Sequence, residues 1–461
     1  MNTTTQDTIC AISTPPGVGG IAIIRVSGKD AIPICEQIFA PRQKANKLSE
    51  QAAYTIAYGT IHKNNDILDD VLVSVFRAPH SFTGEDTVEI TCHGSLYIQQ
   101  QLMQLLIENR CRSAQPGEFT QRSFMNGKMD LSQAEAVADL IASTSSGMHQ
   151  LAINQMRGGF SAELSQLRAQ LLDFTSLIEL ELDFSEEDVE FANRTQLQEL
   201  AEKINRKIID LADSFNAGNV IKNGIPVAII GKPNVGKSTL LNALLNEERA
   251  IVSDIPGTTR DTIEETINIG GQLFRFIDTA GLRQNTSDQI EAMGIKRSFE
   301  KAEKAAIILY LFDLADEDIE DVISTSQWLQ GLQKPVLMVG TKNDLARKSP
   351  MHTSGNVMSV YISCKEPADI ERIKNKIVSI VQPQLINNND VIVTNARHYE
   401  ALCRAQSSIA RVLEGLSNNL SGDFLSQDIR ECLHHLGEIT GGEIATDEVL
   451  SNIFSKFCIG K

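Results

Sequence analysis

A glycine-rich segment in the middle of the chain has the residue types and spacing to hold a phosphate group. Residues 231–238 read GKPNVGKS, which fits the pattern GxxxxGK[ST]. An apolar run precedes this segment and the helix-forming TLLNALL follows it, which is the strand–loop–helix context that a P-loop requires. We expect Lys237 to contact the β- and γ-phosphates and Ser238 to coordinate Mg²⁺. A glycine-rich turn without a ligand is the alternative.

Three more motifs follow in the order typical of a guanine-nucleotide site. DTAG (residues 278–281), TKND (residues 341–344) and the short loop 363–365 each come after a predicted strand. Because the carboxyl ends of parallel strands meet at one edge of a sheet, these motifs should lie together there. Asp344 can accept two hydrogen bonds from the guanine edge, which adenine does not supply. The four motifs together predict a GTP site.

Two positions depart from the common GTPase pattern. Leu282 follows DTAG, where Ras-type enzymes have the glutamine that orients the attacking water. Thr341 stands where asparagine is more usual in NKxD. The second change is mild, since Asp344 supplies the discrimination between bases. The first means that another group must position the water.

The rest of the chain divides into regions that would hold this site. Residues 1–118 alternate short β-rich runs (21–26, 71–76, 88–92) with helices near 30–39 and 95–108, and predict a small α+β domain. Residues 119–220 and 384–461 have helical spacing, and 221–383 alternate strands with helices. We therefore predict a multidomain protein in which an α/β P-loop domain is inserted into a discontinuous α-helical domain. Polar stretches 214–224 and 384–390 are the expected linkers.

Composition excludes several classes of protein. The chain has 461 residues, 42% of them apolar, and a formal net charge of −17, which disfavours indiscriminate nucleic-acid binding. The longest apolar run has eight residues (305–312), too few for a membrane span. The start of the sequence has no secretory signal. Eight cysteines without a CxxC pair predict reduced thiols and a cytoplasmic protein.

Several longer segments carry a resemblance to one family. The segment DIPGTTRD (residues 254–261) is similar to the switch I of TrmE/Era-type GTPases. The chain opens with DTICAISTPPGVGGIAIIRVSG, contains SFTGEDTVEI and PGEFTQRSFMNGKMDLSQAEAVADLI, and ends in FCIGK. With the inserted α/β domain, these segments resemble the MnmE (TrmE) family of tRNA modification GTPases over essentially the whole chain.

The resemblance implies that K⁺ fills the place of an arginine finger and that the α/β domains dimerise across their nucleotide faces. It implies Mg²⁺ ligands at Ser238 and Thr259, and K⁺ ligands at Asn234, Ser253, Ile255 and Thr258. Glu291 would orient the water, so the implied catalytic residues are Glu291, Lys237 and Asn234. The expected GTP-binding residues are Asn234, Val235, Gly236, Lys237, Ser238, Thr239, Ser253, Asp254, Ile255, Pro256, Gly257, Thr258, Thr259, Asp278, Thr279, Ala280, Gly281, Thr341, Lys342, Asn343, Asp344, Ser363, Cys364 and Lys365.

The resemblance also implies a second site. The family's N-terminal domain mediates homodimerisation and binds a tetrahydrofolate one-carbon carrier, and the matching positions are Arg25, Glu89, Lys128 and Lys461. Cys458 is either a reactive thiol or a packed cysteine. The implied function is a K⁺-stimulated GTPase that works with an FAD-containing partner, MnmG. Together they would add an aminomethyl or carboxymethylaminomethyl group to C5 of the wobble uridine (position 34) of certain tRNAs.

Two other functions stay open at this point. The PGTTRD switch also occurs in Era-like ribosome-assembly GTPases, which have no modification chemistry. Such a protein would normally carry a KH-like or basic RNA-binding module, and none is evident in the sequence. A folate-dependent methyltransferase with a regulatory α/β domain is the third possibility.

Overall fold

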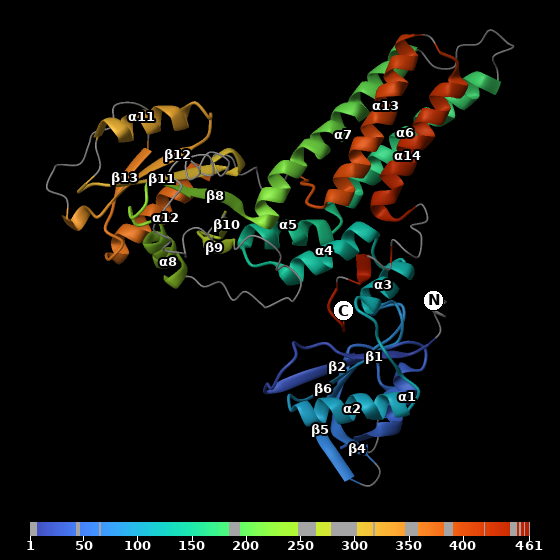
Figure 1. Ribbon diagram of the computed structural model, residues 1–461. Coiled ribbons are helices and arrows are strands. Elements are labelled where there is room, and N and C mark those ends of the chain that lie inside the picture. The colour runs from blue at the N-terminus through green and yellow to red at the C-terminus, as the bar shows by residue number, and fades with distance from the viewer. Residues whose placement is uncertain are drawn as a thin grey trace. The chain divides into compact units, whose positions relative to one another are not determined.

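The computed structural model describes residues 7–42, 47–63, 66–183, 194–247, 264–277, 302–316, 319–345, 358–381, 391–418, 420–442, 450, 453–455 and 457–460. The chain forms two compact units (Figure 1). One contains Met1–Ala138 and Leu433–Lys461, and the other Asp139–Cys432. Among the described residues, no helix combines the length and apolar character needed to cross a membrane.

A seven-stranded sheet forms the centre of the first unit. Its strand order is β3-β4-β5-β6-β2-β1-β7, antiparallel except for the β1–β7 pair. The bounds are β1 Ile9–Ile12, β2 Ile21–Ser27, β3 Phe39–Pro41, β4 Thr55–Lys63, β5 Asp66–Phe76, β6 Thr87–His93 and β7 Arg112–Ser113. The predicted strands near 21–26, 71–76 and 88–92 are confirmed.

The two faces of this sheet differ because side chains alternate along each strand. Ile24, Val73 and Ile90 are fully buried or nearly so, in one core with the helices α1 (Ala31–Ile38) and α2 (Leu96–Glu108). The opposite face carries Arg25, which pairs across the strands with Glu89. The helices α3 (Glu118–Met125) and α4 (Leu131–Ala142) follow the sheet, and a 3₁₀ turn covers Leu48–Glu50.

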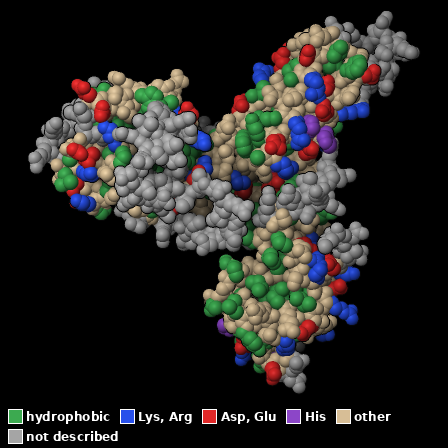
Figure 2. Space-filling view, in the orientation of Figure 1, with side chains coloured by type: hydrophobic (Ala, Val, Ile, Leu, Met, Phe, Trp, Pro, Cys, Tyr) green, Lys and Arg blue, Asp and Glu red, His purple; other side chains and the backbone are tan. Residues whose placement is uncertain are grey.

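The second unit contains a helical bundle. It consists of α5 (Ser146–Met156), α6 (Gly159–Asp183), α7 (Arg194–Asn223), α13 (Ala396–Ser417) and the part of α14 (Gly422–Thr440) that belongs to this unit. Phe160, Leu164, Leu167 and Leu171 are buried, as their spacing predicts. On the face seen in Figure 2, acidic and basic side chains are interspersed over the bundle.

The expectation that residues 214–224 form a polar linker is wrong. The helix α7 continues to Asn223, and β8 begins at Ile225. The helix persists because the bundle packs against it: Phe215 stacks on Tyr399 with ring centroids 4.6 Å apart, and Ser214 Oγ accepts from Val393 N at 3.0 Å. The other expected linker, 384–390, lies outside the described residues. The ends of the insertion therefore meet along α7 and the residues that precede α13.

The inserted α/β domain is built on a six-stranded sheet with the order β13-β12-β11-β8-β10-β9, parallel except for β9. The bounds are β8 Ile225–Ile230, β9 Glu265–Ile269, β10 Gln272–Phe276, β11 Ile307–Asp313, β12 Val336–Thr341 and β13 Met358–Tyr361. The helices are α8 (Lys237–Glu247), α11 (Ile319–Gln330) and α12 (Pro367–Val381), with a 3₁₀ turn at Asn343–Leu345. The predicted fold class is thereby confirmed, whereas the exact domain boundaries stay a prediction.

Candidate functional site

The P-loop follows β8 and leads into α8, as its sequence predicts. Gly231 has φ +154°, and a Cβ there would lie 2.3 Å from Leu311 O, so no larger residue fits. Asn234 has φ +62° and Gly236 φ +95°, backbone conformations that turn the loop sharply. Lys237 Nζ donates to Gly231 O at 2.7 Å and to Lys232 O at 2.6 Å. The loop thus presents backbone amides, a helix N-terminus and an ammonium group, which suit a polyphosphate.

Thr341, at the end of β12, ties the TKND motif to the P-loop. Its Oγ1 donates to Val235 O at 2.7 Å and lies 3.1 Å from Phe312 O. Thr341 is almost fully buried. The threonine therefore links the two motifs although asparagine is more usual at this position. Lys342 has φ +56°, and its ammonium group pairs with Asp313 Oδ2 at 2.5 Å.

The residues expected to read the guanine lie in two neighbouring loops. Lys365 Nζ donates to Asp344 Oδ2 at 2.9 Å, and this bond holds the pKa of the Asp344 carboxyl below its usual value. Ser363 N donates to Asp369 Oδ2 at 2.8 Å, which fixes the second loop. Burial raises the pKa of the half-buried Cys364 thiol. The Asp344 carboxylate is thus ionised, so both of its oxygens are acceptors. The side chain is also one-third exposed, so a ligand can reach it.

The structure brings together only part of the predicted nucleotide site. Asn234 to Thr239, Thr341 to Asp344, and Ser363 to Lys365 are described and lie at the same edge of the sheet. The other predicted residues lie outside the described residues: Ser253, Asp254, Ile255, Pro256, Gly257, Thr258, Thr259, Asp278, Thr279, Ala280, Gly281 and Glu291, together with Leu282. Their roles stay predictions.

In the N-terminal domain, Arg25 is held between two aromatic rings and a carboxylate. Its Cζ lies 5.7 Å from the centroid of Phe82 and 5.6 Å from that of Phe119. Its Nε and Nη2 both bond to Glu89 Oε1, at 2.9 and 2.8 Å. Among the described residues Glu89 Oε2 has no such bond, so it can accept an N–H from a ligand. Sequence reasoning identified Arg25 and Glu89 but missed Phe82 and Phe119.

The C-terminal FCIGK segment lies against this position. Gly460 O accepts from Arg25 Nη1 at 3.3 Å and from Ser13 Oγ at 3.1 Å, and Gly117 N donates to Cys458 O at 3.4 Å. Gly460 has φ +93°, and a Cβ there would lie 2.4 Å from Ile12 O. Cys458 is exposed, so the alternative of a packed cysteine is wrong, and Lys461 lies outside the described residues.

Lys128 belongs to the α3–α4 turn rather than to the sheet. Its Nζ donates to Pro79 O at 2.9 Å, beside the loop that carries Phe82. Asn126 Nδ2 donates to Thr83 O at 2.7 Å and Ser123 Oγ to Phe82 O at 2.7 Å. These bonds hold the loop that contains Phe82 against α3. The bond from Lys128 to Pro79 O places Lys128 beside the start of the same loop.

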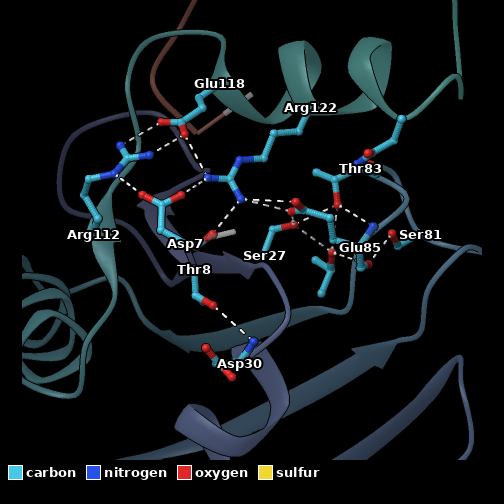
Figure 3. Close-up of polar contacts among 12 residues, drawn as sticks. Asp7, Thr8, Ser27, Asp30, Ser81, Thr83, Glu85, Arg112, Glu118 and Arg122 are labelled. Atoms are coloured by element: carbon cyan, nitrogen blue, oxygen red, sulfur yellow. Dashed lines mark hydrogen bonds and ion pairs between the residues drawn. The ribbon is translucent and has the colours of Figure 1, made fainter. Parts of the chain in front are cut away.

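A network of charged residues lies on one side of α3, the helix that carries Glu118 and Arg122 (Figure 3). Arg122 donates to Asp7 Oδ1 at 2.6 Å, to Glu118 Oε1 at 3.0 Å and to both oxygens of Glu85 at 3.2 Å. Arg112 bonds to Asp7 and Glu118 from the other side. Asp7 and Arg112 are 105 residues apart in sequence, which explains why sequence analysis did not identify the network.

The network predicts a stability loss in acid. Burial alone would raise the pKa values of the Asp7 and Glu118 carboxyls, but the arginine hydrogen bonds outweigh it, and both pKa values lie below the ordinary 3.8 and 4.5. A carboxyl with a lowered pKa stabilises the fold above its ordinary value, and that stabilisation is lost as the pH falls through the lowered one. Calorimetric melting should therefore show the N-terminal unit losing stability below about pH 4.5.

Two variants test this assignment. Glu118→Gln should lower the melting temperature at pH 7 and make its fall in acid shallower, because one of the two carboxyls with a lowered pKa is gone. Glu108→Gln, whose carboxylate bonds only to Gln104 within the described part of the chain, should melt like the unmodified chain at each pH. An unchanged acid profile in Glu118→Gln would contradict the prediction.

Comparisons with known proteins show the family of the chain. The family model described as "GTP-binding protein TrmE N-terminus" matches residues 8–128, and the one described as "MnmE helical domain" matches residues 131–458. A tRNA modification GTPase MnmE from Parabacteroides distasonis is 59% identical, over 99% of this chain and all of that protein. Proteins of the same name from Bacteroides fragilis and Cytophaga hutchinsonii are 57% and 52% identical, over 99% and 100% of this chain and all of each relative. The chain therefore belongs to the MnmE (TrmE) family of tRNA modification GTPases.

Proposed function

We propose that this protein is a K⁺-stimulated GTPase that modifies tRNA together with an FAD-containing partner, MnmG. The reaction would place a 5-aminomethyl or 5-carboxymethylaminomethyl group on the wobble uridine (position 34) of certain tRNAs. A tetrahydrofolate derivative would supply the carbon, and ammonium or glycine the amine. Family membership supports this function over an Era-like ribosome-assembly switch, since the relatives named as tRNA modification GTPases match the whole chain.

One observation carries the GTPase part of the proposal. The bond from Thr341 Oγ1 to Val235 O fixes the base-reading loop to the P-loop, so the phosphate and guanine ends of one nucleotide have binding groups at one edge of the sheet. Lys237 lies across the P-loop with its ammonium bonded to loop carbonyls. Those two bonds are replaceable by phosphate oxygens, and the charge would offset negative charge that develops during hydrolysis.

Two of the proposed metal ligands, Ser238 and Asn234, belong to the described P-loop. Ser238 at the start of α8 would bind Mg²⁺ through its hydroxyl, with Thr259 as its partner ligand. Asn234 would give its amide oxygen to K⁺, with Ser253, Ile255 and Thr258 as further ligands. A cation beside the β–γ bridge supplies the charge that an arginine finger supplies in other GTPases. Glu291 would orient the water, which answers the absence of glutamine at Leu282.

The second part of the proposal is the folate site on the exposed face of the N-terminal sheet. Glu89 Oε2 can accept from the N–H edge of a pterin, and Arg25, Lys128 and Lys461 can neutralise the glutamate tail. Arg25 is only 19% exposed as a side chain, so its charge would interact with a ligand at reduced dielectric screening. Cys458 lies on the adjoining C-terminal segment and is a candidate thiol for the chemistry.

We also propose a homodimer that acts in the cytoplasm. Ile56, Tyr58 and Leu72 are large apolar residues, exposed by 66%, 44% and 44%, and the strand register places them on the same sheet face as Arg25. Figure 2 shows further hydrophobic side chains on the surface of this unit. Exposed apolar patches of this kind are typical of protein interfaces, and either a second copy or MnmG could cover one.

The experiment that tests the GTPase mechanism compares turnover in KCl and NaCl at equal ionic strength. We expect turnover to be about tenfold or more faster in KCl, because the cation replaces an arginine finger. Asn234→Ala should lose the stimulation. Since Asn234 has φ +62°, Asn234→Gly is the matched control: it removes the amide without backbone strain and should lose the stimulation equally. Equal slow rates in both salts would refute the role of K⁺.

A further inference from the structure

The β9–β10 hairpin of the α/β domain is hydrogen-bonded at its tip to the start of α5 in the helical bundle. Gly271 O accepts from Ser146 Oγ at 3.0 Å and from Gly147 N at 3.3 Å. Asn268 Nδ2 donates to Thr144 O at 2.8 Å. Three bonds, two of them made by side chains, therefore join a short stretch of the bundle to the turn of this hairpin.

The turn itself fits closely against the helix. Gly270 and Gly271 have φ +60° and +80°, which a two-residue hairpin turn requires at both positions. A Cβ on Gly271 would lie 2.5 Å from Ser146 Oγ, and one on Gly270 3.2 Å from Val378 Cγ2. The tip of the hairpin is thus confined between α5 and α12, and a larger residue would separate it from the bundle.

The start of α5 is a firm support for this contact. Ser145 caps the helix, with its Oγ accepting from Met148 N at 3.2 Å, and α5 packs on α6 and α7. A Cβ on Gly224, at the turn from α7 into β8, would lie 3.2 Å from Arg275 Cβ and 3.3 Å from Leu273 Cγ. The hairpin is therefore fixed to the bundle at two points, its tip against α5 and its second strand against the end of α7.

The position of the hairpin in the sequence gives this contact its meaning. Strand β9 begins shortly after DIPGTTRD, and β10 ends just before DTAG. The hairpin is therefore the segment that connects the two motifs. Both motifs are expected to contact the γ-phosphate and its metal ions. If either motif shifts between the GTP and GDP states, the β9–β10 hairpin would shift with it. Because the tip of the hairpin is bonded to the bundle, this displacement would change the contact with α5.

We infer that Ser146 and Asn268 are positioning residues for GTP hydrolysis, through which the nucleotide state is coupled to the helical bundle. The inference rests on the proposed GTPase function and deepens it. Coupling of this kind is reciprocal for binding. The bundle holds the hairpin where the motifs on either side can act, and the nucleotide in turn alters the contact at Gly271.

The test uses the full chain with the double substitution Ser146→Ala and Asn268→Ala, which removes both side-chain bonds. Turnover in KCl should show a kcat about three- to tenfold lower, with KM for GTP and melting temperature unchanged. Ser143→Ala is the matched control, since Ser143 follows α4 and its hydroxyl donates to Leu140 O in the last turn of that helix; its kcat should equal that of the unmodified chain.

Amide hydrogen exchange separates coupling from a purely structural role, because a purely structural contact would not make the exchange rates depend on the bound nucleotide. In the unmodified chain, amide exchange of residues 144–150 should differ between the GDP and GDP–aluminium fluoride states, and the double variant should lose that difference. No difference in the unmodified chain, with normal GTP turnover, would overturn the coupling while leaving the GTPase function intact. A fall in kcat that parallels a fall in melting temperature would overturn the positioning role. No turnover in the unmodified chain would refute the proposed function itself.

Discussion

Replacing Asp344 by asparagine is expected to weaken GDP and GTP binding by about 100-fold and to make xanthine nucleotides the preferred ligands. The carboxylate lies in the 3₁₀ turn that follows β12, one-third exposed and bonded to Lys365. It can accept from both N–H groups of the guanine edge, and a hydrogen bond to a charged group contributes about 1.5–3 kcal/mol. An asparagine amide replaces one of the two acceptor oxygens by an N–H donor. This donor is opposed by the guanine amino group, which is also a donor, but it can bond to the carbonyl oxygen that xanthine has at the same position.

Calorimetric titration of the variant with GDP and with XDP measures both sides of this exchange. Asp369→Asn is the matched control, because Asp369 accepts from Ser363 N and shapes the neighbouring loop. It should weaken both nucleotides by similar factors and leave their ratio unchanged. An Asp344→Asn variant that still prefers GDP would show that base recognition depends on other groups, and would remove Asp344 from that role.

The sequence predicts the fold of the α/β domain and the place of the P-loop in it, because these signals are local. A P-loop is one continuous segment between a strand and a helix, so its composition and spacing identify it. The motif TKND is just as compact, and the structure places it where the order of parallel strands predicts. What the sequence did not show is the bond from Thr341 to Val235, since a threonine hydroxyl can replace the usual asparagine only if the two loops approach closely.

The N-terminal site was harder to predict because its contacts join residues far apart in the chain. Arg25 and Gly460 differ by 435 positions, and Asp7 and Arg122 by 115. Neither pair has a sequence signal, since α3 brings charged and aromatic residues together only through the tertiary structure. Likewise, residues 214–223 are polar enough to suggest a linker, yet the stacking of Phe215 on Tyr399 keeps them in α7. Tertiary packing decided both outcomes.

Replacing Arg25 by alanine is expected to lower the affinity for 5-formyltetrahydrofolate by about 30-fold while leaving GTP turnover unchanged. The guanidinium is mostly buried between Phe82 and Phe119 and bonded to Glu89 and Gly460 O. Its loss removes a cation from the proposed site and releases the C-terminal segment from one of its bonds. The P-loop and base-reading loops belong to the other compact unit, so nucleotide chemistry should continue.

Two further variants separate loss of a ligand contact from loss of structure. Arg25→Lys keeps the charge but not the planar fork, so its folate affinity should lie between those of the unmodified chain and Arg25→Ala. Arg42→Ala removes another arginine that stacks on an aromatic ring, Tyr58 at 5.6 Å, and should bind folate normally. Because Arg25 also neutralises Glu89, melting temperatures of all three variants must accompany the titrations. Normal folate affinity in a stable Arg25→Ala variant would mean that the charge faces the C-terminal segment alone, and the folate site would have to be placed elsewhere.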